Sequence, residues 1–199
     1  MPARTRSILK PILSLLIGVV MNLTAINIVA TTPHEAVTDF MDGLKTGDEQ
    51  EMEKYLDNQY VNLLVNATGD EAVIDRMYDA LFRNFSYEIV ETGEKNDVAV
   101  AKVLVRSNDF SGVMEAYNQV SYDYVVSNLY TDEIADKEAL SAQCLELYVQ
   151  QIEAAAEGEA TLETTVFVPM IDDRYHGWNI VISDEMMRSI LGNLQMPAF

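Results

Sequence analysis

Beyond residue 30, hydrophobic residues first recur at the three- to four-residue spacing that is typical of helices packed on one face. Thr32, Pro33 and Glu35 have the pattern of a helix start, with an N-cap, a proline in the first turn and the glutamate of a capping box. Gly47 ends this predicted helix and Asp48 caps a second one. The residues expected on the inner faces of the two helices are Val37, Phe40, Met41, Leu44, Met52, Tyr55 and Leu56.

A third helix is predicted over about residues 70–84, after which the hydrophobic period changes to two. Residues 86–92 and 98–106 have the alternation of strands, and residues 93–97 between them predict a turn. The same pattern returns in residues 161–171 and 178–182. The sequence therefore predicts two antiparallel hairpins.

Between the hairpins, residues 109–157 return to helical spacing, with one helix near its start and another over residues 136–155. A short helix capped by Asp184 is expected after the second hairpin. The order helices, hairpin, helices, hairpin lacks the strand–helix–strand alternation of parallel sheets. It predicts an α+β fold in which helices pack on one face of an antiparallel sheet, with residues 31–199 as one domain.

The first 30 residues have the pattern of an export signal. An apolar stretch at residues 12–20 follows a positively charged region, and Ala30 offers a small residue for a signal peptidase; the basic residues are Arg4, Arg6 and Lys10. No charged residue occurs from residue 11 to residue 33, a length sufficient to span a bilayer. A cleaved signal and a membrane anchor both stay open. In either case the positive flank stays inside, which places the domain outside the cytoplasm.

The rest of the chain is strongly acidic. The protein has 13 Lys and Arg residues against 32 Asp and Glu, a formal net charge of −19. All the acids and ten of the bases lie beyond residue 30, so that part carries −22. Nucleic acid and anionic lipid would be repelled. We therefore expect no nucleic-acid partner, and membrane contact only through the N-terminal segment.

Several segments resemble exported bacterial proteins of the nuclear transport factor 2-like (cystatin-like) superfamily. Residues 33–48 are similar to their opening helix, residues 85–110 to their first hairpin and the helix after it, and Gly177-Trp178-Asn179-Ile180 to their closing strand. The resemblance covers most of residues 31–193. It implies a curved sheet wrapped around N-terminal helices as a cone, often with a pocket at the wide end. It implies no single activity, because that superfamily includes enzymes, binding domains and interaction modules.

The candidate site residues are one aspartate and five tyrosines. Enzymes of that superfamily use Asp, Tyr or His inside the cone for proton transfer, which would make Asp57 a base and Tyr55 and Tyr60 the groups that stabilise an enolate. The candidate ligand-binding residues are Tyr122, Tyr124 and Tyr130, in the helical stretch between the hairpins. A structural interpretation is also open, since tyrosines commonly pack at the edge of a core with their hydroxyls near solvent.

Metal and cofactor motifs are not found in the sequence. The two histidines, His34 and His176, are far apart, and Cys144 is the single cysteine, which we expect to be buried. We therefore expect neither a metal nor a cofactor. The leading hypothesis is a non-catalytic extracytoplasmic domain that binds a small ligand or a partner protein at the cell envelope. The alternatives are a small enzyme using an Asp/Tyr pair in the cone, or a structural envelope module, with a homodimer as one possible assembly.

Overall fold

The computed structural model describes residues 32–66, 70–174 and 177–197. The predicted export segment lies outside these residues. Helix α2 (Pro33–Thr46) opens the described chain with the expected capping box, in which the Thr32 side chain accepts a hydrogen bond from the Glu35 backbone N–H. The helix ends at Gly47, which adopts a left-handed conformation with φ 69°. In the part of the chain that is described, no helix is long and apolar enough to cross a membrane.

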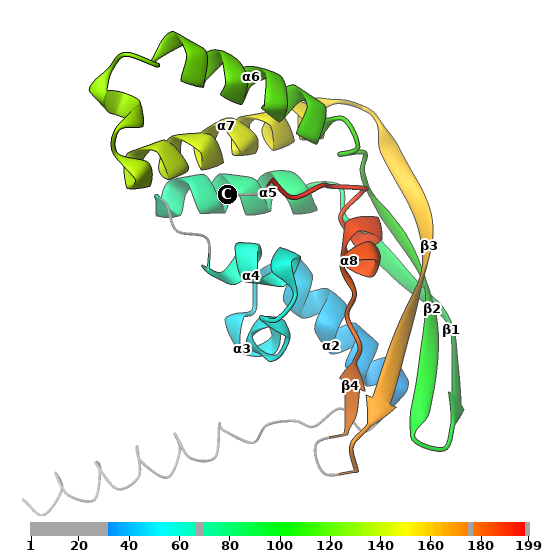
Figure 1. The fold of residues 1–199 in the computed structure, drawn as a ribbon. Helices are drawn as coiled ribbons and strands as arrows, with labels where there is room; N and C mark the ends of the chain where they lie inside the picture. The colour runs from blue at the N-terminus through cyan, green and yellow to red at the C-terminus, as the bar shows by residue number, and fades with distance from the viewer. Residues whose placement is uncertain (1–31, 67–69, 175–176, 198–199) are drawn as a thin grey trace, which may run out of the picture.

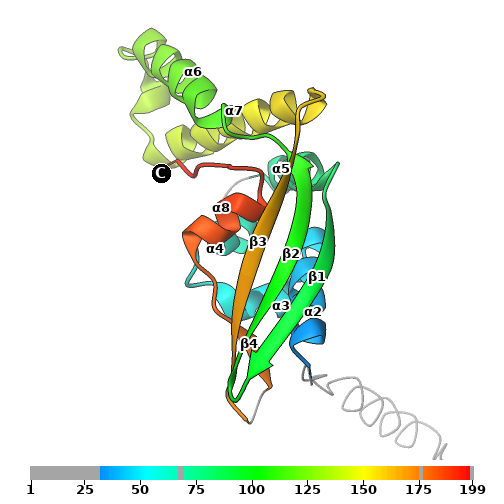
Figure 2. The ribbon, with the colours of Figure 1, turned by 90° about the vertical axis from the view of Figure 1, so that its right-hand side faces the viewer.

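The four strands form one antiparallel sheet in the order β1-β2-β3-β4. Their bounds are β1 (Ser86–Lys95), β2 (Val98–Asn108), β3 (Thr161–Asp172) and β4 (Trp178–Ile180). The sheet is curved and stays open, with helices on its concave side and none of the described helices on its other face (Figures 1 and 2). This arrangement confirms the predicted α+β fold, in which a curved antiparallel sheet wraps around the N-terminal helices.

The remaining helices are α3 (Glu49–Met52), α4 (Gln59–Asn66), α5 (Glu71–Phe82), α6 (Val113–Ser127), α7 (Lys137–Glu157) and α8 (Asp184–Ile190), with short 3₁₀ helices η1 (Glu53–Tyr55) and η2 (Asp132–Ile134). Helix α4 was not predicted, although the Asn58 side chain caps it by accepting hydrogen bonds from the backbone N–H groups of Tyr60 and Val61.

The predicted cap of α8 was wrong by one residue. Ser183 is the N-cap, and its hydroxyl accepts a hydrogen bond from the Met186 backbone N–H at 3.2 Å. Asp184 instead accepts hydrogen bonds from the side chains of Asn58 at 2.9 Å and Gln59 at 2.6 Å. This carboxylate therefore ties the start of α4 to the start of α8, a long-range role that local sequence patterns do not reveal.

The concave side of the sheet is filled by side chains of the protein itself. Alternate residues of β2 and β3 point inward, among them Ala101, Val103, Val166 and Val168. They belong to the same buried cluster as fully buried residues of α2 and α8, which include Phe40, Met41, Leu44, Met187 and Ile190. The inner surface of the cone is thus a packed core.

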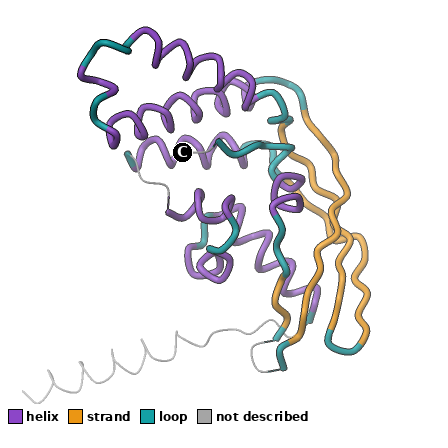
Figure 3. Tube along the Cα trace, viewed as in Figure 1, coloured by secondary structure: helices purple, strands orange, loops and turns teal. Residues whose placement is uncertain are grey.

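Helices α6 and α7 form an antiparallel pair that we call the arm (residues 113–157). The arm leaves the sheet between β2 and β3, and it extends past the edge of the sheet above α5 (Figures 1 and 3). Helix α7 packs on α5 on one side and on α6 on the other. This is the helical stretch between the two predicted hairpins.

Candidate binding surfaces

The structure does not gather Asp57, Tyr55 and Tyr60 into one buried site. Asp57 is exposed, whereas Tyr60 is buried and its hydroxyl donates a hydrogen bond to the Leu194 backbone carbonyl at 3.0 Å. Tyr55 is half-buried with its ring edge-to-face on Phe40, the centroids 5.3 Å apart. Among the described residues, no hydrogen bond or ion pair joins Asp57 to either tyrosine.

The two tyrosines of this set have the environment of structural residues. Burial raises the pKa of Tyr55, and the nearby Glu51 carboxylate raises it further. Burial also raises the pKa of Tyr60. Both hydroxyls therefore stay protonated at neutral pH, and that of Tyr60 fixes the C-terminal segment to the core through Leu194.

The other three candidate tyrosines lie together on the arm. Tyr122 is 66% exposed and Tyr130 is 97% exposed, whereas Tyr124 is half-buried and donates to the Glu133 carboxylate at 3.3 Å. Partial burial and the Glu133 carboxylate raise the pKa of Tyr124. The structure thus places Tyr122 and Tyr130 on the outer surface of the molecule, away from the interior of the cone where an enzyme site was expected.

The outer half of the arm (residues 118–144) has no buried residue. The inner half, in contrast, contributes Tyr117, Leu145, Tyr148, Val149 and Ile152 to the core. The buried residues of α7 begin at Leu145, next to the Glu146 carboxylate that contacts Arg76 of α5. The outer half is therefore a two-helix layer in which the described residues leave every side chain at least partly exposed.

Four large apolar side chains are exposed on this outer half, and we call them the arm stripe: Tyr122, Val126, Leu129 and Tyr130. Tyr122 and Val126 are one helical turn apart on α6, and the other two follow directly after the end of that helix. The described residues expose ten large hydrophobic side chains, and the other six belong to the sheet and the segment after β4. The arm stripe is thus one of two groups of exposed apolar residues.

Acidic residues surround the arm stripe. The arm carries nine acidic residues and one basic residue, Lys137, a net charge of −8. Glu133 and Asp123 lie close to the stripe in sequence, and Asp136 caps α7 by accepting hydrogen bonds from the backbone N–H groups of Glu138 and Ala139. An approaching protein would therefore meet apolar side chains inside a negative field.

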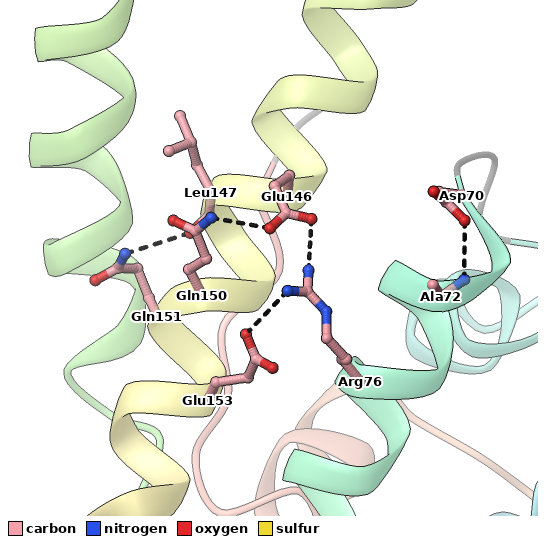
Figure 4. Close-up of polar contacts among 8 residues, drawn as sticks. All are labelled: Asp70, Ala72, Arg76, Glu146, Leu147, Gln150, Gln151 and Glu153. Atoms are coloured by element: carbon pink, nitrogen blue, oxygen red, sulfur yellow. Dashed lines mark hydrogen bonds and ion pairs between the residues drawn. The ribbon is translucent and has the colours of Figure 1, made fainter.

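A cluster of polar contacts fastens the inner half of the arm to α5 (Figure 4). Arg76 of α5 contacts Glu146 of α7 at 2.5 Å and Glu153 at 3.7 Å. The second oxygen of Glu146 accepts a hydrogen bond from Gln150 at 2.9 Å. The hydrogen bond from Arg76 lowers the pKa of Glu146, so this pair remains ionised at neutral pH.

A groove lies between the end of α2 and helices α3, α4 and α5. This groove has a volume of about 780 Å³, and its apolar wall includes Tyr78 and Phe82, whose rings stack with centroids 5.5 Å apart. Burial and the Glu49 carboxylate raise the pKa of Tyr78 to about 12. The charged lining residues are Glu49, Glu71, Asp75, Asp79, Lys45 and Arg83. Sequence reasoning missed this groove because part of its wall belongs to α4.

Cys144 and the acidic side chains are the remaining groups with reactive or metal-binding chemistry. Cys144 is half-buried beside Tyr117, so the expectation of a buried thiol is met in part. Within residues 32–66, 70–174 and 177–197, no group of three or more His, Cys, Asp or Glu side chains is placed to hold a metal ion.

No protein-family model matches the chain, and no curated protein matches it. The fold is similar to the crystal structure of YcdA from Bacillus subtilis, which is described as a candidate lipoprotein, with 18% sequence identity and a TM-score of 0.39. The likeness covers 74% of this chain and 44% of the other, so this chain spans less than half the length of the protein that it matches.

Proposed function

We propose that this chain is an extracytoplasmic, non-catalytic binding domain that uses the arm stripe to bind a partner protein of the cell envelope. The observation that carries the proposal is the outer half of the arm, which exposes four large apolar side chains and buries none. Exposed apolar groups that lie together and are rimmed by polar residues mark interaction sites. Export, and membership of the nuclear transport factor 2-like superfamily, rest on the sequence patterns of residues 1–30 and 33–193.

The chemistry of the stripe indicates a basic, amphipathic partner. The arm has a net charge of −8, which attracts Lys- and Arg-rich surfaces and repels acidic ones. Tyr122 and Tyr130 are suited to the centre of an interface, because tyrosine supplies a large contact area and a hydroxyl that can donate a hydrogen bond. The inner end of the arm is fixed by Arg76, so the stripe is presented on a supported element.

The first test is photo-crosslinking in intact cells of the source organism. A photoreactive phenylalanine analogue replaces Tyr130, and we expect it to form one discrete adduct with another envelope protein. The matched control carries the same analogue at Phe167, on the sheet, where that adduct should not form. An identical adduct from both positions, or none from position 130, would argue against the arm as the binding surface.

The second test measures binding directly. The probe is a synthetic amphipathic helical peptide of Lys and Leu, titrated into the full chain. Tyr122→Ser should weaken binding about tenfold or more, since a central aromatic contributes about 2 kcal/mol to an interface. Tyr87→Phe, which changes a tyrosine on β1, should leave the affinity unchanged. Equal affinity of both variants would contradict the proposal.

A small cationic ligand in the groove is a second candidate function. The observation in its favour is the stacked Tyr78–Phe82 pair inside a rim with four acids and two bases. Aromatic faces and carboxylates together suit an organic amine. Spermidine serves as the probe in calorimetric titration, and Tyr78→Leu should abolish its binding while Tyr122→Leu retains it. Absence of any heat with wild-type protein would rule out polyamines of this kind.

A further inference from the structure

The second group of exposed apolar residues lies on the convex face of the sheet. Residues of β2 and β3 alternate between buried and exposed, and the exposed set on β2 includes Val98 and Val100, whereas that on β3 includes Phe167, Pro169 and Ile171. Phe167 is 62% exposed although it lies on an inner strand of the sheet. Figure 2 shows this face toward the viewer, with none of the described helices in front of the strands.

The exposed residues on this face form one continuous patch, because the strand register brings them side by side. Val98 is opposite Ile171, and Val100 is opposite Pro169. Val181, which follows β4, donates its backbone N–H to the Pro169 carbonyl at 2.9 Å and is itself exposed. We call the six residues the sheet patch: Val98, Val100, Phe167, Pro169, Ile171 and Val181.

The convex face differs in charge from the rest of the domain. On β1, β2 and β3 it carries three acids and three bases, which are Glu88, Glu91, Glu163, Lys95, Lys102 and Arg106. Arg106 and Glu163 form an ion pair across the strands at 2.8 Å. The net charge of this face is therefore zero, while the described residues as a whole carry 32 acids and 10 bases.

We propose that two copies of this chain associate through the sheet patch as a two-fold symmetric dimer. Two copies would repel each other through most of their surface, because each carries −22 beyond residue 30. The convex face avoids this repulsion and supplies apolar area that is removed from water on contact. A two-fold axis brings the same patch against itself, so both sides of the interface have zero net charge and the same apolar residues.

Charge also argues for a second copy over a different protein. A basic partner is attracted to the arm and to the acidic remainder of the surface, and a neutral face gives it no advantage. For a copy of this acidic chain the neutral face is the place where approach costs least. The dimer leaves the arm stripe open, because the arm projects from the concave side of the sheet in Figure 1.

The experiment is sedimentation equilibrium of the full chain, as the cell processes it, in density-matched detergent. Wild-type protein should show a concentration-dependent monomer–dimer equilibrium. Phe167→Glu should lower the association constant at least about a hundredfold, since a symmetric interface contains the substitution twice. Phe167 is largely exposed, so we expect the variant to keep its fold, and circular dichroism checks this. A monomer at every concentration for the wild type would overturn the proposal.

The control variant is Tyr122→Glu on the arm, which should dimerise like the wild type. Loss of the dimer in Tyr122→Glu together with its retention in Phe167→Glu would place self-association on the arm and overturn the proposal. A crosslinking experiment in cells complements the sedimentation experiment. The photoreactive analogue at position 167 should give an adduct of twice the mass of the chain. Failure of partner binding leaves this outcome untouched, because the two surfaces do not share a residue.

Discussion

Gly192 shows how one residue joins two distant parts of the fold. It has φ +60°, and a Cβ atom at this position would lie 1.9 Å from the backbone oxygen of Asn108. Its own carbonyl accepts a hydrogen bond from the Phe110 backbone N–H at 2.8 Å. The chain after α8 therefore fits against the end of β2 only if residue 192 lacks a side chain.

Gly192→Ala should consequently lower the free energy of unfolding by about 3 kcal/mol or more, because the left-handed conformation and the clash with the Asn108 backbone both penalise a Cβ atom. Gly93→Ala is the matched control, since nothing lies within 4 Å of a Cβ at Gly93. We expect the control to stay within about 0.5 kcal/mol of the wild type in urea unfolding. Similar losses in both variants would contradict the close approach at Gly192.

The buried tyrosines predict a loss of stability in alkali. Burial raises the pKa of Tyr78 and Tyr117 to about 12 from an ordinary value of 10.0, so the folded state holds these protons more tightly than the unfolded state. Their contribution is therefore fully present below pH 10 and is lost as the pH rises toward 12. Urea unfolding across this range should show a falling free energy, with a shallower fall in Tyr78→Phe. An unchanged slope would show that Tyr78 is accessible.

At the scale of elements, the arm depends on Arg76 for its attachment. Without this guanidinium, Glu146 and Glu153 would face each other with no counter-charge. Arg76→Gln should lower the free energy of unfolding by about 1 kcal/mol or less, because the side chain of Arg76 is 41% exposed and solvent screens the pair. Arg106→Gln is the control, since its pair with Glu163 lies on the convex face away from the arm.

The same pair has a signature in acid. Arg76 lowers the pKa of Glu146 in the folded state, so its stabilising effect is present above the unfolded pKa and is lost as the pH falls through the folded value. In Arg76→Gln this part of the acid sensitivity should disappear. Unfolding curves of both proteins, measured from neutral pH downward, check the prediction, and parallel curves would show that the contact does not persist in solution.

The arm is also where elements differ most in expected mobility. Residues 118–144 include no buried side chain, whereas residues 145–157 include several that pack in the core. Hydrogen exchange should therefore be fast in the outer half and slow in the inner half. Mass spectrometry of peptic peptides gives this contrast, and uniform protection along α7 would contradict it.

At the scale of the whole molecule, the sequence was sufficient for the fold class and for the order of the elements apart from α4. The capping box of α2, the Asp48 cap of α3 and the alternation of β2 are local signals, and each one was correct. Helix α4 was missed because it is short and only residues 56–58 separate it from η1. What the sequence could not supply is which part of a helix is covered: Leu140 near the start of α7 is only half-buried, whereas Val149 and Ile152 further along the same helix are buried.

For the candidate surfaces too, the sequence indicated residue types but not their exposure or their neighbours. Tyr122 and Tyr130 were noticed from their residue type, but their exposure became apparent only from the way the arm projects. Asp57 was placed with Tyr55 and Tyr60 because the three are close in sequence, yet it is exposed and Tyr60 is buried. The neutrality of the convex face depends on the register of three strands, which no single segment contains.

The two proposed surfaces predict opposite responses to salt for the molecule as a whole. Screening weakens the attraction between the acidic arm and a basic peptide, so the affinity should fall as ionic strength rises. Screening also reduces the repulsion between two copies that each carry −22, so the dimer should strengthen. Peptide titration and sedimentation at low and high salt test both; the same direction in the two experiments would count against one of the assignments.

The lack of buried residues in the outer half of the arm has a consequence for how the protein can evolve. Most destabilising substitutions act through the core, and residues 118–144 do not contribute a fully buried side chain to it. This stretch can therefore accumulate changes that a strand such as β2 could not accept. A lineage that acquires a new partner can change the helical residues of this stretch and the loop between them, while the sheet and its covering helices are inherited unchanged.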